Sequence, residues 1–476
     1  MNCGREHDAR EFRYFCLGCG GFLDVAFDTD EIKRSLSRDD IDSRPPSIMH
    51  RWLEFLPVEN PQLIDVVSLG ESVSPLIRAG RVARKLGLKN LYFKDESRFP
   101  TGSLKDRSMP LVVLKALEFG FSSVSIVSSG NAAASLSAYA ARAGLQAVVF
   151  VAGGHSARLA KIRSYRPTLV QVNAPYSETE SLYLKAREHY GWYDCNGLIN
   201  PFRLEGKKTL AHEICHALGW TVPDIVILPT AFGNGLVSAW RGFLELEQIG
   251  WTSGRPAMFA AQPENCAPIA RAMEKGAETV EPVTPLPTVA NSIAVGDPAI
   301  GGGRVLKVAR ESGGGATGVP EELILEAQAL LAGEEGLFVE PAGATGLATV
   351  MKMLAESRMD HDALIVASIT GEGLNDPEIV ERWAPGIQTI EPDIGSLRRV
   401  LDRIQDQRAG KRPGMGVCSE RVDMEGKDDD ETVESGLPGP RPGRGRVRSC
   451  RLRCPRSGAE NACRSTQGGA QADQDR

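Results

Sequence analysis

Short apolar runs alternate with segments of helical pattern between about residues 62 and 385. Three of these runs, at 123–127, 225–228 and 363–368, have the length and composition of buried strands. The run Leu91-Tyr92-Phe93 alternates in the manner of a half-buried strand. Strands that alternate with helices along a chain predict parallel strands covered by helices, and therefore an α/β fold.

Each buried run ends in a short loop that contains glycine. An Ala-rich helix is expected at 132–143 after the first loop, and another is expected from Leu236 after the second. In an open α/β sheet, ligands bind at the carboxyl ends of the strands. The loops at 128–131, 229–235 and 369–373 are therefore predicted to lie where a ligand binds.

Two of these loops have the composition of anion sites. A small glycine-containing loop that leads into a helix offers unpaired backbone N–H groups and the positive end of the helix dipole. Residues 231–235 could in this way bind a cofactor phosphate, and residues 128–131 a substrate carboxylate. Such loops are also common as plain connectors, and spacing alone does not separate the two readings. Because neither loop has a Walker lysine or the full dinucleotide glycine spacing, nucleotide binding is disfavoured.

Composition and charge exclude several classes of protein. A chain of 476 residues is long enough for two or more domains with their own cores. The net charge of −6 argues against nucleic acid as a partner, since binding phosphate backbones requires a positive surface. No apolar run approaches the length of a membrane helix. Residues 5–8 (Arg-Glu-His-Asp) stand where a signal peptide has its apolar stretch, so a cytoplasmic protein is expected.

The two ends of the chain differ from its middle. Residues 1–28 have the pattern of a small separate module. From residue 408 to residue 476, Gly, Pro, Arg and Ser dominate. A segment of that composition buries too little apolar surface to fold. Residues 408–476 are therefore predicted to be a disordered tail.

The N-terminal module carries candidate metal ligands. Cys16-Leu17-Gly18-Cys19-Gly20 has the spacing of half a zinc ribbon, and Cys3-Gly4 resembles the second half of another such turn. Tetrahedral zinc requires four ligands, and these cysteines supply three. The fourth would be His7 or a cysteine upstream of Met1, and otherwise the site has decayed. Cys3, Cys16 and Cys19 are thus predicted zinc ligands in a zinc-ribbon-like module.

A second metal motif competes with this interpretation. The segment His212-Glu213-Ile214-Cys215-His216 matches the H-E-x-x-H pattern, in which two histidines one helical turn apart hold zinc. No clear third ligand follows it, and histidines at this spacing also occur on the packing or solvent face of an amphipathic helix. A metalloprotease is therefore disfavoured.

One lysine is a candidate for covalent chemistry. Residues 99–107 read Phe-Pro-Thr-Gly-Ser-Leu-Lys-Asp-Arg and place Lys105 on a turn rich in Pro, Gly and Ser. A lysine on a rigid turn can present its amine to a carbonyl carbon and form a Schiff base. Most lysines are solvated surface groups. Whether Lys105 is a reactive lysine therefore depends on the motifs further along the chain.

The order of six motifs resembles that in threonine synthases, which are pyridoxal-phosphate enzymes of the tryptophan-synthase-β fold (fold type II). The resemblance covers about residues 1–385, including the cysteine-bearing module. The third motif discriminates best, because dehydratases and cysteine synthases share the lysine motif but generally lack this one. The six motifs are P-T-G-S-L-K-D-R (100–107), S-S-G-N (128–131), N-P-F-R-L-E-G-K-K-T (200–209), N-S-I-A-V-G-D-P (291–298), E-P-A-G-A (340–344) and T-G-E-G-L-N-D-P (370–377).

The resemblance implies the architecture and the site. It implies two open, mostly parallel twisted sheets flanked by helices, with a large cofactor domain (29–107 and 200–407), a small mobile domain (108–199) and assembly as a homodimer. Lys105 would form the Schiff base with pyridoxal phosphate, Asn131 would touch the pyridoxal 3′-oxygen, and Thr370 would donate to the pyridine nitrogen. The cofactor phosphate would be held by Ala231, Phe232, Gly233, Asn234 and Gly235, and the substrate carboxylate by Ser128, Ser129 and Gly130.

The reaction that the resemblance implies converts O-phosphohomoserine and water to threonine and phosphate. Lys105, once freed from the cofactor, would act as the base that moves protons. Arg203 would grip the substrate phosphate, because a guanidinium fork matches phosphate oxygens and stays charged. A surface salt bridge with Glu205 is the alternative reading of Arg203.

Departures from the family pattern leave the substrate open. Leu104 replaces a phenylalanine, and Ala132 removes a hydroxyl next to the substrate. Glu372 and Asn375 replace a histidine and a lysine, which is expected to make that part of the pocket less favourable for a phosphate dianion. One alternative is a serine/threonine dehydratase, or a phosphoserine-using synthase of the cysteate kind. The other is a catalytically silent pyridoxal-phosphate binder.

Overall fold

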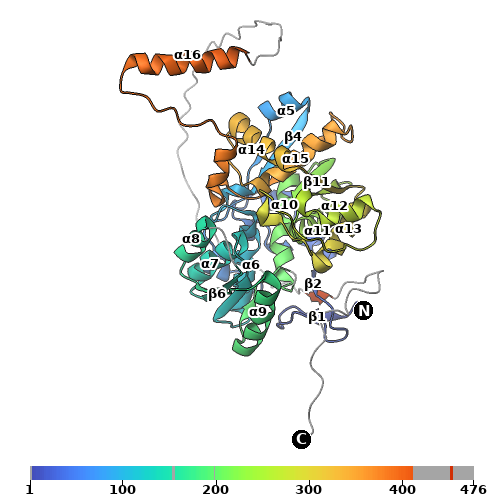
Figure 1. Ribbon diagram of the computed structural model, residues 1–476. Coiled ribbons are helices and arrows are strands. Elements are labelled where there is room, and N and C mark those ends of the chain that lie inside the picture. The colour runs from blue at the N-terminus through green and yellow to red at the C-terminus, as the bar shows by residue number, and fades with distance from the viewer. Residues whose placement is uncertain (1–2, 153–155, 198, 411–450, 454–476) are drawn as a thin grey trace, which may run out of the picture. The chain divides into compact units, whose positions relative to one another are not determined.

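The computed structural model describes residues 3–152, 156–197, 199–410 and 451–453 (Figure 1). Two compact units divide the chain: residues 1–383 together with 447–476 form the first, and residues 384–446 form the second. The described part of the second unit contains one long helix, α16 (Ile394–Gly410). All of the predicted functional residues lie in the first unit.

The larger sheet of the first unit has six strands, in the order β11-β10-β9-β12-β4-β3. Neighbouring strands are parallel except at one edge, where β3 runs antiparallel to β4. The strands are β3 (Leu76–Arg78), β4 (Asn90–Asp95), β9 (Ile225–Pro229), β10 (Ala257–Pro263), β11 (Gly315–Val319) and β12 (Leu364–Ile369).

Both faces of this sheet are buried, which explains why its strands read as continuous apolar runs. Along β9, Val226 and Leu228 join the core on one face, whereas Ile227 between them joins the core on the other. The first face packs against α10 (Phe202–Ala217), α11 (Asn234–Gln248), α12 (Pro268–Glu274) and α13 (Ala299–Glu311), and the second against α5 (Arg81–Leu86), α14 (Glu321–Glu335) and α15 (Pro341–Ala355).

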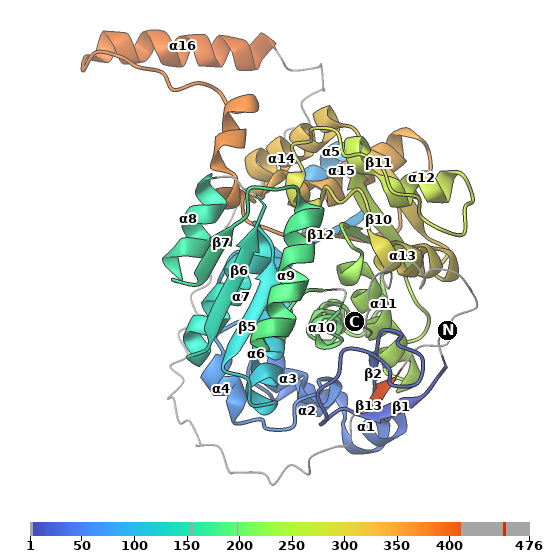
Figure 2. The ribbon, with the colours of Figure 1, turned by 60° about the horizontal axis from the view of Figure 1, so that its bottom comes forward.

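A smaller sheet of four parallel strands has the order β7-β6-β5-β8. It is formed by β5 (Ser123–Val127), β6 (Gln146–Val151), β7 (Thr168–Gln171) and β8 (Tyr193–Asp194). Its helices are α6 (Met109–Glu118), α7 (Asn131–Ala143), α8 (Ser156–Ser164) and α9 (Tyr176–Tyr190). Figure 2 shows α10 running between the strands of this sheet and those of the larger one.

A third sheet joins the N-terminal module to the C-terminal segment. Its strands are antiparallel, in the order β1 (Glu6–Asp8), β13 (Arg451–Arg453) and β2 (Asp24–Ala26). The short helices that follow are α1 (Thr29–Ser35), α2 (Arg38–Asp42), α3 (Ile48–Arg51) and α4 (Leu63–Val67).

The predicted disordered tail needs a correction at two segments. Of the tail at 408–476, residues 411–450 and 454–476 lie outside the described residues, but residues 408–410 are the end of α16 and residues 451–453 form β13. Two strands that face each other across a gap leave unpaired N–H and C=O groups, which a third extended segment can satisfy. A pattern too polar to build a core of its own therefore still supplies a strand here.

The two α/β sheets agree with the expected fold class and confirm the elements predicted from sequence. The run at 123–127 is a strand, and the runs at 225–228 and 363–368 are strands within one residue at each end. The Ala-rich helix spans Asn131–Ala143 and ends at Gly144, whose φ of +71° is the left-handed conformation that glycine adopts without strain. No helix in the described part of the chain has the length and apolar character needed to cross a membrane.

Candidate active site

The turn that carries Lys105 follows the carboxyl end of β4. It forms the short helix η3 (Leu104–Arg107). The buried Asp106 carboxylate fixes it by accepting hydrogen bonds from the Thr101 N–H (2.6 Å) and the Ser135 hydroxyl (2.5 Å). Burial raises the pKa of Asp106 to about 6, although these hydrogen bonds lower it. The lysine therefore sits on a rigidly held turn, as its sequence predicts.

A buried ionic network anchors the same turn to α10. The guanidinium of Arg107 is fully buried and donates to Glu96 Oε1 (2.8 Å) and to both carboxylate oxygens of Glu213 (2.8 and 2.7 Å). Lys94 Nζ donates to the same carboxylate at 2.7 Å. Burial alone raises the pKa of Glu213, but the charges of Arg107 and Lys94 outweigh it and hold that pKa at about 2. The Glu213 carboxylate is therefore charged at neutral pH.

The Lys105 amine itself is left without a partner. Among the described residues, no group accepts a hydrogen bond from its Nζ or pairs with it. Burial lowers the pKa of Lys105, the Glu340 carboxylate opposes that effect, and the Arg203 guanidinium adds to it. An amine with a lowered pKa has the neutral form that a nucleophile or a base requires.

The loop after β9 has the geometry of an anion site. Gly233 lies at φ +86°, and a Cβ there would come within 2.2 Å of Val305 Cγ2, so the turn requires glycine. Helix α11 begins directly afterwards at Asn234, and no side chain caps its first N–H groups. Asn234 instead donates through Nδ2 to the Gly197 carbonyl (2.9 Å). Backbone N–H groups at the start of α11 are thus available for a phosphate.

The loop after β5 is built in a similar way. The Gly130 N–H donates to the Ser128 hydroxyl at 3.2 Å, which turns that side chain back onto its own loop. Helix α7 begins at Asn131 without a side-chain cap. The Ser128 N–H also has an acceptor, the Phe150 carbonyl (3.0 Å). The N–H groups of Ser129 and Asn131 have no acceptor among the described residues, and they lie at the carboxyl end of β5, where the sequence predicted a carboxylate site.

Glu340 is a site residue to which the sequence analysis gave no role. Its carboxylate is buried and accepts hydrogen bonds from Asn131 Nδ2 (3.1 and 3.2 Å) and from the Ser292 hydroxyl (3.1 Å). Glu340 therefore orients Asn131, which comes from the smaller sheet, towards the larger one. The E-P-A-G-A motif was the signal in the sequence, since it places a glutamate directly before a helix that begins with proline.

The loop after β12 lies against the Lys105 turn. The Leu104 N–H donates to the Thr370 carbonyl (3.0 Å), and the Glu372 N–H donates to the Gly102 carbonyl (2.9 Å). Because β12 and β4 are parallel neighbours, their following loops meet at the same edge of the sheet. The pairing brings Thr370 beside the turn of Lys105, although the two are far apart in the sequence.

Glu372 and Asn375 share a partner that the sequence did not predict. The two residues were expected to make the pocket less favourable for phosphate. However, Lys161 of α8 donates through Nζ to Glu372 Oε1 (2.7 Å) and to Asn375 Oδ1 (2.9 Å). A cation from the smaller sheet's helix thus balances the carboxylate. The sequence could not reveal this partner, since it lies on a distant segment.

Arg203 is not a surface residue, so the alternative prediction of a surface salt bridge with Glu205 is wrong. Its side chain is buried and donates through Nη1 to the Cys195 carbonyl (2.7 Å). Glu205 pairs instead with Lys208 (2.8 Å) and Arg241 (3.1 Å). No carboxylate of the described chain lies within ion-pair distance of Arg203. Burial lowers its pKa to about 10, which still leaves the guanidinium charged at neutral pH.

The H-E-x-x-H motif is committed to other contacts. His212 packs between the rings of Trp52 and Phe55 on the buried side of α10, with centroid distances of 5.1 and 4.5 Å. His216 reaches Asp42 Oδ1 through Nε2 (2.6 Å). Glu213, the residue that would act as a base, belongs to the Arg107 network. The motif therefore belongs to the packing of α10, which agrees with the preferred reading of the sequence.

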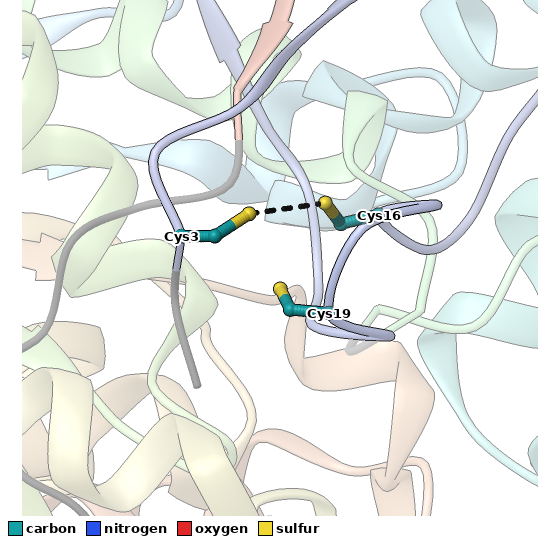
Figure 3. A group of neighbouring side chains, drawn as sticks. All are labelled: Cys3, Cys16 and Cys19. Atoms are coloured by element: carbon teal, nitrogen blue, oxygen red, sulfur yellow. Dashed lines mark hydrogen bonds between the residues drawn. The ribbon is translucent and has the colours of Figure 1, made fainter.

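The three N-terminal cysteines come together as predicted. The Sγ atoms of Cys3, Cys16 and Cys19 all lie within 4.8 Å of one another, and Figure 3 shows them turned towards a common centre. Cys3 and Cys16 approach to 3.5 Å, and His7 Nε2 lies 3.3 Å from the Cys16 sulfur. The Gly18 N–H donates to Cys16 Sγ at 3.4 Å.

Comparisons with known proteins agree on one family. Residues 67–371 match the family model described as pyridoxal-phosphate dependent enzyme. The threonine synthase of Methanocaldococcus jannaschii is 38% identical over 406 residues, which cover 85% of this chain and 99% of the relative. The threonine synthase of Methanosarcina acetivorans is 34% identical over 403 residues, covering 84% and 97%.

Solved structures agree on the fold. Maize serine racemase superposes with a TM-score of 0.56 at 18% identity, covering 73% of this chain and 97% of that structure. The processed form of threonine deaminase isoform 2 from Solanum lycopersicum gives a TM-score of 0.55 at 18% identity, covering 77% and 98%. At these identities the likeness concerns the fold alone.

Proposed function

The chain belongs to the family of pyridoxal-phosphate dependent enzymes and, within it, to the threonine synthases, and from this premise we infer that it converts O-phosphohomoserine and water to threonine and phosphate. The geometric observation that carries the inference is a buried cation without a counter-ion. Arg203 has no carboxylate partner in the described chain, yet it lies close enough to the unpartnered Lys105 amine to lower its pKa. A phosphorylated substrate supplies the missing negative charge.

The residues present fit pyridoxal phosphate. The Lys105 amine would hold the cofactor covalently, and the uncapped N–H groups of residues 231–235 would bind its phosphate. Asn131, oriented by Glu340, and Thr370 would contact the ring. When bound, the cofactor supplies an electron sink for the carbanion left by removal of the substrate's α-proton.

Side chains and backbone groups of the protein transfer the protons and bind the substrate. Once free, Lys105 removes and returns protons at the α- and β-carbons, since its lowered pKa supplies a neutral amine. The loop of Ser128, Ser129 and Gly130 binds the substrate carboxylate, and the Ser129 N–H is its free backbone donor. Arg203 stabilises the phosphate as the bond between its oxygen and the γ-carbon breaks, and water then supplies the hydroxyl at Cβ. Overall, one water is consumed and one phosphate is released.

A panel of four amino acids tests the proposal. The holoenzyme is incubated with O-phosphohomoserine, O-phosphoserine, serine and threonine, and inorganic phosphate, threonine and keto acids are quantified. We expect equimolar threonine and phosphate from O-phosphohomoserine. Release of only pyruvate or ketobutyrate would support the dehydratase alternative, and release of phosphate from O-phosphoserine alone would support the synthase of the cysteate kind. Cofactor binding without any turnover would identify a silent binder.

The setting of the enzyme is part of the same proposal. A phosphorylated amino acid as substrate, a homodimeric assembly and a cytoplasmic location are all proposed from the family resemblance. So are the large domain at 29–107 and 200–407 and the small mobile domain at 108–199. The ion pair between Lys161 and Glu372 then joins the small domain to the large one. Light scattering of the purified protein tests the dimer.

We also propose that the N-terminal module binds zinc through Cys3, Cys16 and Cys19, with His7 in the fourth position. The 3.5 Å between two sulfurs and the 3.3 Å between sulfur and imidazole are close to the edges of a tetrahedron with zinc–ligand bonds of about 2.0–2.3 Å. Both Cys-Gly steps turn at positive φ, +70° at Gly4 and +67° at Gly20. The thiols are thus gathered before a metal enters.

Elemental analysis tests the zinc site without recourse to activity. We expect about one zinc per chain after purification, and loss of it in Cys19→Ser, because two thiolates no longer complete the ligand set. Cys266→Ser, which changes a buried cysteine elsewhere, serves as the matched control and should retain the metal. Protein that stays free of zinc after incubation with the ion and removal of excess would contradict the site.

A further inference from the structure

Apart from Lys105, one buried lysine of the described chain has no partner. Four lysines besides Lys105 are buried there, and three of them pair with carboxylates: Lys94 with Glu213 (2.7 Å), Lys115 with Glu118 (2.5 Å) and Lys208 with Glu245 (2.6 Å). The fourth, Lys207, is only 4% exposed and has no hydrogen bond or ion pair with any described residue. A buried ammonium without a counter-charge is unfavourable, so this exception requires a reason.

The position of Lys207 supplies that reason. It follows Arg203 by one helical turn on α10, so the two side chains lie on the same face of the helix. The neighbouring Gly206 packs so closely on the Lys105 turn that a Cβ would lie 2.1 Å from the Arg107 carbonyl oxygen. Helix α10 passes between the smaller sheet and the larger one (Figure 2). Lys207 is therefore placed with Arg203, next to the residue of α10 that packs on the turn of Lys105.

Lys207, Arg203 and Lys105 are thus three basic groups, and none of them has a carboxylate partner among the described residues. Burial lowers the pKa of Lys207, and the charges of Arg203 and Lys105 lower it further, so the neutral amine is favoured until an anion binds. The cofactor phosphate is accounted for by the backbone N–H groups of residues 231–235, at the start of α11. A second anion beside Arg203 would favour the protonated form of Lys207 and supply the counter-charge that both groups lack.

We propose that Lys207, with Arg203, binds the phosphate group of the substrate and selects phosphorylated amino acids over their hydroxyl counterparts. The ammonium acts as a point charge, whereas the guanidinium of Arg203 fixes the orientation of the phosphate. The side chain of a hydroxyl amino acid carries no negative charge, so it leaves Lys207 and Arg203 without a counter-charge. This assignment rests on the proposed function and deepens it by naming the residue that sets substrate class.

The test compares Lys207→Met with the wild-type holoenzyme. We expect the dissociation constant for inorganic phosphate, measured by calorimetry with the cofactor in place, to rise roughly 10–100-fold. The KM for O-phosphohomoserine should rise by a similar factor, with a smaller change in kcat. Lys207→Gln repeats the measurement if the methionine variant fails to fold, and Lys207→Arg, which keeps the charge, should bind phosphate within a few-fold of wild type.

A stability measurement separates this role from a structural one. Without phosphate, Lys207→Met should unfold at the same temperature as wild type or higher, because it removes an unpaired buried charge. Lys115→Met is the matched control: it removes a buried lysine that has a partner, and should lower the midpoint. A phosphate dissociation constant within twofold of wild type in both Lys207→Met and Lys207→Gln would overturn the proposal.

The outcomes also separate this proposal from the function on which it rests. Phosphate binding that depends on Lys207, in an enzyme that does not turn over O-phosphohomoserine, would retain the phosphate site and refute the threonine synthase reaction. Normal turnover with phosphate binding unaffected by the substitutions would retain the reaction and refute the role of Lys207.

Discussion

Lys105→Ala is expected to abolish turnover, with kcat falling by at least about 10³-fold. The substitution removes both the amine that holds the cofactor and the base that moves the protons. The other buried lysines of the described chain are placed differently: Lys94, Lys115 and Lys208 pair with carboxylates, and Lys207 lies on α10 rather than on this turn. The visible absorbance of the bound cofactor should shift, because the covalent link to the protein is lost.

Two controls make the result specific. Lys89→Ala removes an exposed lysine that pairs with Asp362 at 2.7 Å, and it should leave both absorbance and turnover unchanged. Added methylamine should restore a measurable part of the activity of Lys105→Ala, since a small amine can enter the space that the side chain leaves. Threonine formation by Lys105→Ala at near wild-type rate would refute the assignment of this lysine.

The second large effect is expected at Arg107. Replacement by methionine leaves Glu96 and Glu213 buried with Lys94 as their remaining cation. Breaking a buried ion pair by removing one partner typically reduces the free energy of unfolding by roughly 3–5 kcal/mol. Because Arg107 lies in the same turn as Lys105, kcat should fall as well. Denaturant unfolding followed by circular dichroism measures the first effect, and steady-state kinetics the second.

A surface pair provides the comparison for Arg107. Arg81 pairs with Glu334 at 2.7 Å, but its side chain is 62% exposed. Arg81→Met should therefore change the free energy of unfolding by less than about 1 kcal/mol. Equal effects of Arg81→Met and Arg107→Met would mean that burial of the network contributes nothing to stability.

The same network predicts how stability depends on pH. The folded pKa of Glu213 is about 2, below its ordinary value of 4.5. A carboxylate with a depressed folded pKa stabilises the folded state fully above its unfolded pKa, and this contribution is lost as the pH falls through the folded pKa. Wild type should therefore lose stability between about pH 4.5 and 2. Glu213→Gln should be less stable at pH 6, and the difference from wild type should shrink towards pH 2.

Much of the site was predictable because its signals are local. The run at 123–127 alternates with helices, and the turn of Lys105 is fixed by bonds within a few residues, such as that between Thr101 and Asp106. The glycine loop before α11 likewise requires only its own backbone conformation. Patterns of this kind involve only residues that are close together in the sequence, so they can be recognised without knowledge of the fold.

Other features of the structure could not be predicted, because they depend on contacts between segments that are far apart in the sequence. Lys161 neutralises Glu372 from a helix of the other sheet, and β13 joins the N-terminal module from the far end of the chain. The H-E-x-x-H motif illustrates the same limit, because only the partners of His212 and His216 show what the histidines do.

The sequence by itself determined the α/β class, since this follows from local pattern. It also predicted the reactive lysine and the anion-binding loops, from turn chemistry together with the order of the family motifs. Only the tertiary structure distinguished Lys207 from Lys208. The two are chemically identical neighbours, yet successive residues of a helix point about 100° apart. Lys208 therefore meets a carboxylate from α11, whereas Lys207 is buried without a carboxylate partner among the described residues.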